Sequence, residues 1–154
     1  MLVQGADGNL YGTAAGGGTN NYGTIFKITP SGKLTTPCSF CPQSACTDGE
    51  YPSAGLVQAA KGAFYGTTGS GGANGYGTVF KITPGGTLTT LYSFCAQSGY
   101  ADGENPVAGL KSVAPEAQAR TRARDEVTLI SGGNISCQAT LTTTVIQSIS
   151  PGRP

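Results

Sequence analysis

The sequence of 154 residues contains no histidine and no tryptophan, and only 11% of its residues are charged. The lack of histidine excludes catalytic triads, general bases and metal sites that depend on an imidazole. A formal net charge of +1 gives no electrostatic basis for binding nucleic acid or an anionic membrane. No apolar run approaches the ~20 residues of a membrane span. The start, MLVQGADGNLYG, has neither the basic nor the apolar region of a signal peptide. We therefore expect no nucleic-acid partner, no membrane span and no signal peptide in this chain.

Glycine, in contrast, is abundant, with 25 residues. Its share is more than twice the usual ~7%, which disfavours a coiled coil or a long helical bundle. Glycine does not recur at every third position, so the chain is not collagen-like. Of the 25 glycines, 22 lie before residue 111, so the excess belongs to one part of the chain.

An internal repeat accounts for this part. Residues 2–55 align without a gap with residues 56–109, and 34 of the 54 aligned positions are identical. A third copy would begin at Leu110, but the sequence from Lys111 onward contains all four arginines and no aromatic residue. We predict a domain of two repeats over residues 1–110. Residues 111–154 are then a tail of different origin or one degenerate repeat.

Each repeat contains four short runs of residues that favour β-strands, separated by turn signals such as Asp7-Gly8 and Pro30-Ser31-Gly32. In the first copy these runs are Leu2–Gln4, Leu10–Ala14, Thr24–Thr29 and Leu34–Phe40. A four-stranded unit of ~50 residues in tandem is typical of a β-propeller blade. The prediction is an all-β fold, with two tandem four-stranded blades of an incomplete propeller and an irregular or partly β tail. Because a propeller closes with about 4–8 blades, we expect contacts with other repeats or self-association through the open blade faces.

The repeated motifs also resemble a known family. They are D-G-N-L-Y-G-T, Y-G-T-[IV]-F-K-I-T-P and D-G-E-x-P-x-A-G-L-V-Q, and together they resemble the GloVer tandem repeat over residues 2–110. The resemblance implies a bacterial, exported, propeller-like repeat protein without an assigned biochemical activity, at an extracytoplasmic or cell-surface location. Since such proteins carry many copies, the two copies here lead us to expect a fragment of a longer repeat protein.

Cysteines form the first candidate site. Cys41 and Cys46 flank a four-residue loop, and hairpin geometry would bring them close enough for a disulfide. Such a bond stabilises a short loop by about 2 kcal/mol and agrees with an oxidising compartment. The second repeat keeps Cys95 but has Tyr100 in place of Cys46. Free thiols, or a metal or redox site that includes Cys38, are the alternatives; a zinc site lacks a fourth ligand.

Two acidic loops form the second candidate site. The sequence Asp-Gly-Glu occurs once in each repeat, and its acidic residues are Asp48, Glu50, Asp102 and Glu104. Paired carboxylates could bind calcium or act as the acid and base of a glycosidase. A hydrolase site has one such pair and not one per repeat, so the residues favour a structural turn. We predict no catalytic residue, no cofactor and no metal, and treat the four carboxylates only as candidates for loop binding.

These observations predict a non-enzymatic, extracytoplasmic tandem-repeat module that serves as a structural or interaction scaffold. The alternative is a carbohydrate-binding or polysaccharide-acting β-propeller enzyme. A glycan or a protein could be the partner. Four tyrosines that precede glycine either stack on sugars or pack between blades; they are Tyr11, Tyr22, Tyr65 and Tyr76.

Overall fold

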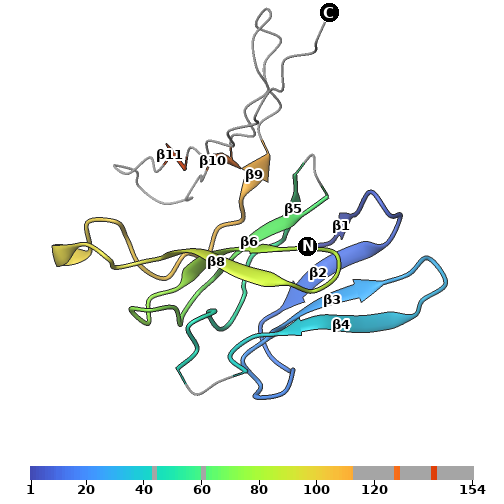
Figure 1. The fold of residues 1–154 in the computed structure, drawn as a ribbon, viewed down its shortest axis with the longest axis horizontal. Helices are drawn as coiled ribbons and strands as arrows, with labels where there is room; N and C mark the ends of the chain where they lie inside the picture. Colours follow the sequence, from blue (N-terminus) through green and yellow to red (C-terminus); the bar gives the residue numbers. More distant parts are fainter. Residues whose placement is uncertain (43–44, 60–61, 113–126, 129–139, 142–154) are drawn as a thin grey trace, which may run out of the picture.

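The computed structural model describes residues 1–42, 45–59, 62–112, 127–128 and 140–141. It contains two four-stranded antiparallel sheets, and in each sheet the strands neighbour one another in chain order (Figure 1). The first sheet comprises β1 (Val3–Gln4), β2 (Leu10–Ala14), β3 (Thr24–Ile28) and β4 (Leu34–Ser39). The second comprises β5 (Val57–Gln58), β6 (Phe64–Thr68), β7 (Thr78–Ile82) and β8 (Leu88–Ser93). The predicted all-β fold with two four-stranded units is confirmed.

Helical structure is minimal. In the described part of the chain it consists of the three-residue 3-10 helix η1 (Ser98–Tyr100). Accordingly, none of the described segments forms an apolar helix of membrane-spanning length.

A third, smaller sheet follows the repeats. Its strands are β9 (Lys111–Ser112), β10 (Val127–Thr128) and β11 (Thr140–Leu141), with β10 in the middle. Strand β9 lies one repeat length after β5 and two after β1, so its position matches that of the first strand of each repeat. Leu110, just before it, is buried. Most of the predicted tail 111–154 lies outside the described residues.

The turn between β1 and β2 follows from local chemistry. Of the Asp7-Gly8 pair only Gly8 has a positive φ, 79°. The Asp7 carboxylate instead accepts hydrogen bonds from Asn9 and from the Tyr11 hydroxyl. The Asp7 side chain thus stabilises the turn through hydrogen bonds to residues that follow it, as aspartate commonly does in turns.

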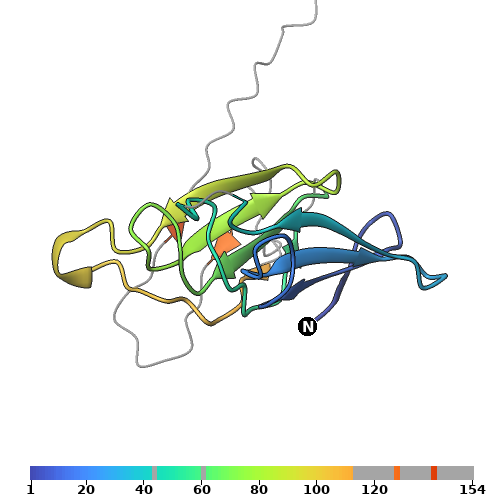
Figure 2. The same cartoon turned by 90° about the horizontal axis from the view of Figure 1, so that it is seen from below.

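The two sheets pack face to face around one continuous core (Figure 2). The rings of Tyr11 and Phe64 lie 4.2 Å apart between centroids, and those of Phe40 and Phe80 lie 5.2 Å apart. Both pairs join one repeat to the other. The core consists of Tyr11, Ile25, Phe40, Leu56, Phe64, Phe80 and Ile82. Because one cluster contains side chains from both repeats, this core is built jointly by the two repeats.

The glycine of the first Tyr-Gly-Thr motif in each repeat, Gly12 or Gly66, lies under a phenylalanine ring. A Cβ atom at Gly66 would lie 2.6 Å from the ring of Phe80 and 3.0 Å from Leu56. At the equivalent Gly12 it would lie 2.6 Å from the ring of Phe26. A phenylalanine ring therefore lies directly over each glycine, and any larger residue would displace it.

Candidate functional site at the junction of the repeats

The segment that joins β4 to β5, residues 40–56, crosses from the first sheet to the second; we call it the first loop (teal in Figure 1). Glu50 forms an antiparallel bridge with Ser70. The Glu50 N–H donates to the Ser70 carbonyl at 2.8 Å, and the Ser70 N–H donates back at 3.2 Å. Gly72 N–H donates to the Cys46 carbonyl at 2.8 Å. The first loop thus pairs with the backbone that follows β6 and ties the two repeats together.

Gly49 lies at the centre of this contact. It is buried, with a φ of 99°. A Cβ atom there would collide with the Thr68 hydroxyl and lie 2.7 Å from that of Thr78. The two threonine hydroxyls are buried and hydrogen-bonded to each other at 2.8 Å. Only glycine fits both the backbone angle and this close approach.

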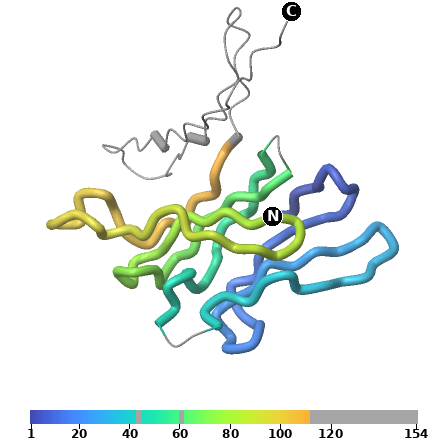
Figure 3. The backbone as a smooth tube through the Cα atoms, viewed as in Figure 1, coloured from blue at the N-terminus to red at the C-terminus, as the bar shows by residue number. Residues whose placement is uncertain are grey.

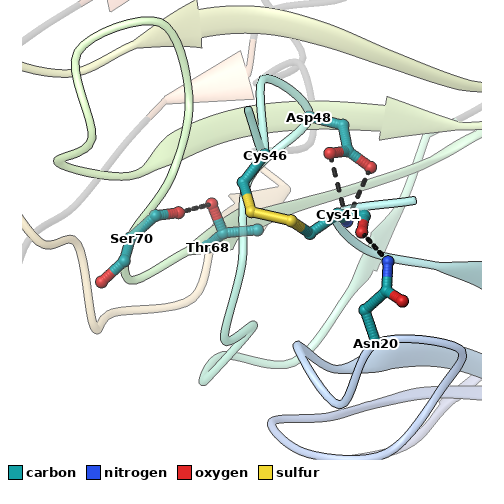
Figure 4. The surroundings of a disulfide bond; sticks show 6 residues. All are labelled: Asn20, Cys41, Cys46, Asp48, Thr68 and Ser70. Atoms are coloured by element: carbon teal, nitrogen blue, oxygen red, sulfur yellow. Dashed lines mark hydrogen bonds between the residues drawn. A yellow bond between two sulfur atoms is a disulfide. The ribbon is translucent and has the colours of Figure 1, made fainter. Parts of the chain in front are cut away.

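A disulfide bond joins Cys41 to Cys46 beside this contact, with Cα atoms 4.2 Å apart (Figure 4). Asn20 donates its side-chain N–H to the Cys41 carbonyl at 2.6 Å. Both carboxylate oxygens of Asp48 accept the Cys41 N–H, each at 3.2 Å. Burial raises the pKa of the Asp48 carboxyl, and the hydrogen bonds from backbone amides partly oppose that rise. The half-buried carboxylate therefore anchors the loop backbone.

The remaining described cysteines, Cys38 and Cys95, are free and half-buried. Burial, with a smaller contribution from the charge of Asp48, raises the pKa of the Cys38 thiol to about 11. Because only the thiolate is an effective nucleophile or metal ligand, this thiol is unreactive at neutral pH. The sulfurs of Cys41 and Cys46 lie within 4.8 Å of a Glu50 oxygen, a grouping that could hold a metal. The two sulfurs are bonded to each other, however, so the Glu50 carboxylate is the one remaining metal ligand of this group.

The segment that joins β8 to β9, residues 94–110, is the second loop, and its backbone repeats that of the first. Non-glycine residues with positive φ occupy the same aligned positions in both loops. The pairs are Cys41 and Cys95 (52° and 62°), Cys46 and Tyr100 (44° and 58°), and Tyr51 and Asn105 (54° and 48°). Such angles are uncommon for these residues. The loop shape is therefore common to both repeats although only the first has the disulfide.

Different side chains hold the second loop in this shape. Tyr100, which stands in the place of Cys46, packs edge-on against Tyr76 with centroids 5.5 Å apart. Asp102 accepts hydrogen bonds from the Tyr92 hydroxyl at 2.6 Å and from the Ala96 N–H at 2.8 Å. The hydrogen bond from Tyr92 is the main cause that lowers the pKa of the Asp102 carboxyl. The aspartate of both repeats thus anchors its own loop.

The four predicted carboxylates consequently have four different surroundings. Asp48 is bound to the Cys41 amide, and Glu50 lies beside the disulfide. Asp102 is bound to Tyr92, whereas Glu104 is exposed. Thr68, Thr78 and Ser70, which contact the first loop, were not predicted from the sequence. The sequence offers one indirect hint of this contact: a glycine lies at the centre of both Asp-Gly-Glu motifs, as a close approach to another segment requires.

Comparison with known proteins places the repeats in a family. No curated protein and no solved structure matches the chain. The model of the Gloeobacter/Verrucomicrobia repeat matches residues 1–116. This match includes both four-stranded sheets, both loops and β9. The chain therefore belongs to the Gloeobacter/Verrucomicrobia repeat family.

Proposed function

We propose that this chain is a non-enzymatic, extracytoplasmic scaffold module that works by stacking one repeat on the next. The observation that carries the proposal is the first loop, whose Gly49 is inserted against Thr68 and Thr78 of the following repeat. This contact and the shared aromatic core are both made between repeats. Both contacts therefore join repeats, as in propellers and other repeat architectures.

The surroundings of the acidic residues support a structural role over the enzymatic alternative. A glycosidase needs two carboxyl groups that flank a substrate, one of them able to donate a proton. Asp48 directs both of its oxygens to a backbone amide of its own loop. Asp102 likewise binds an amide and a tyrosine of its own loop. These hydrogen bonds fix loop geometry and thus favour a structural role for the carboxylates of Asp48 and Asp102.

Two features support a location outside the cytoplasm. The Cys41–Cys46 disulfide fits an oxidising compartment, because cytosolic thiols are kept reduced. The GloVer resemblance implies exported proteins. The test is intact mass after alkylation of protein from the native host, with and without reductant. Two additional alkylated thiols after reduction support the proposal, and no difference contradicts it.

Cooperative unfolding tests the stacking itself. In urea, Ile25→Ala in the first repeat and Phe64→Ala in the second should each shift one common transition, because both side chains belong to the shared core. Losses of about 2–5 kcal/mol are expected for such truncations. Two separate transitions, each sensitive to one variant only, would refute stacking as the organising interaction.

A polysaccharide hydrolysis screen tests the enzymatic alternative, with Glu50→Gln and Glu104→Gln as controls. Turnover by the wild type that is lost in either variant would overturn the non-enzymatic assignment.

A further inference from the structure

The contact between the repeats has two sides, and each side recurs in an unoccupied form elsewhere in the chain. The second loop carries the inserting side. Gly103 corresponds to Gly49 and has a φ of 84°, but it is exposed and a Cβ atom there would meet nothing within 4 Å. The part of the second loop that contains η1 extends away from the sheets (yellow in Figure 3). It thus has the shape of the first loop without its receiving surface.

The first repeat carries the receiving side. Residues 69–72, to which the first loop binds, are half-buried or buried. The equivalent residues 15–18 are all exposed. Ala14 and Thr24 stand where Thr68 and Thr78 stand, so small side chains again border the place for an inserted glycine. The backbone that would receive a loop is therefore present on the first repeat and is open to solvent.

The apolar face next to this backbone is open as well. In each sheet, three apolar residues that pair across neighbouring strands form a row on one face. In the second sheet this row, Phe64, Ile82 and Leu88, faces the shared core. In the first sheet the same row has no neighbouring repeat: Leu34 is 59% exposed, and Leu2 is 52% exposed against 3% for the equivalent Leu56. The rows are Leu10, Ile28 and Leu34 in the first sheet, and Phe64, Ile82 and Leu88 in the second.

The opposite face of the second repeat supplies the complement. Tyr65 and Phe94 are half-buried, whereas the equivalent Tyr11 and Phe40 are buried against the second sheet. Val79 and Thr67, at the centre of this face, are already buried within the single chain, where the Thr67 hydroxyl donates to the Ala108 carbonyl and Leu110, the equivalent of Leu2, is also buried. A partner is therefore expected to gain its contacts at the rim, through the two aromatic rings and the second loop.

We propose that a second copy of this chain binds head to tail, with the second loop of one copy on residues 14–24 of the next. Gly103 would then lie where Gly49 lies within the chain, and the open row of the first sheet would face Tyr65 and Phe94. This inference rests on the proposed stacking function and extends it from repeats within a chain to separate chains. Because the two surfaces differ, the association is heterologous and closes into a ring or grows into a filament. Propeller geometry gives a ring of about two to four copies.

The test measures the molar mass of the full chain by light scattering over a wide range of concentration. Leu34→Asp alters the receiving face, and Gly103→Asn alters the inserting loop. Leu34 is exposed, and asparagine tolerates a positive φ, so both variants should keep the fold. The wild-type mass should rise with concentration to a multiple of the monomer. Each variant should raise the concentration for half-assembly by at least about tenfold.

Mixing the two variants provides the sharper control. The Leu34→Asp copy keeps its second loop, and the Gly103→Asn copy keeps its receiving face, so together they should form a one-to-one dimer. A face-to-face association of identical surfaces would not be rescued in this way. A wild-type chain that stays monomeric, single variants that assemble like the wild type, or a mixture that fails to pair would each overturn the proposal. A monomer that still unfolds in one transition overturns only this inference, whereas two separate transitions overturn the stacking function.

Discussion

Replacement of Gly49 by alanine isolates the contact between the repeats, because Gly103 provides a matched control in the same chain. Both glycines have a positive φ, 99° and 84°, so alanine should incur a similar backbone strain of about 1–2 kcal/mol at either position. Only at Gly49 does the added Cβ atom also collide with Thr68 and approach Thr78. Overpacking of a buried contact adds about 1–3 kcal/mol. We therefore expect Gly49→Ala to lower the free energy of unfolding by about 2–5 kcal/mol and Gly103→Ala by about 1–2 kcal/mol.

Urea unfolding followed by far-ultraviolet circular dichroism measures the difference, because the chain has no tryptophan for fluorescence. The midpoint should fall further for Gly49→Ala, with an unchanged slope, since the surface exposed on unfolding stays the same. Equal losses for the two variants would refute the reasoning, because they would show that the insertion against Thr68 and Thr78 contributes nothing beyond backbone strain. A third variant, Thr68→Ala combined with Gly49→Ala, should recover part of the loss by making room for the new methyl group.

Three further predictions concern the cysteines and the tyrosines. Cys46→Ser should remove about 2 kcal/mol of stability by opening the loop closed by Cys41, which a lower urea midpoint would report; a midpoint that reductant leaves unchanged in the wild type contradicts this. Burial and the nearby Asp7 carboxylate raise the pKa of Tyr11 to about 12 from 10.0. The free energy of unfolding that this shift contributes should be fully present below about pH 10 and be lost between pH 10 and 12, and Tyr11→Phe should reduce that loss. The lowered pKa of Asp102 contributes stability above about pH 4 that is lost as pH falls through its folded value. Tyr92→Phe should shrink that acid loss in a stability–pH profile, and an unchanged profile would argue against the Tyr92 hydrogen bond as its cause.

Local patterns in the sequence were sufficient to predict the strands and most turns. The segment Thr24–Thr29 alternates, and the structure forms β3 from its first five residues because the Thr29 N–H turns to the Lys33 carbonyl. Gly8 and Gly32 have the positive φ that turn glycines supply. These features depend on neighbours within a few residues, which is why one sequence contains enough information to place them.

The receiving side of the repeat contact could not be predicted in the same way. Thr68 and Thr78 lie on two strands, and Gly49 reaches them from the preceding repeat. Nothing in the local sequence relates these three positions. The positive φ of Cys41 and Tyr51 was equally hidden, since neither residue type favours that conformation and only the surrounding contacts impose it.

The two loops have the same backbone angles but are held in shape by different side chains. In the first loop a disulfide and the Tyr22–Tyr51 ring pair, 5.6 Å apart, accompany the positive φ values. In the second loop the cysteine is replaced by Tyr100, which supplies the ring partner of Tyr76, and Tyr51 is replaced by Asn105. The aromatic contact therefore moves to another position, while the backbone angles and the central glycine stay. Gly103 makes the local hydrogen bonds of its own loop, to the Tyr100 carbonyl and from the Cys95 N–H, and its positive φ alone accounts for a glycine at this position.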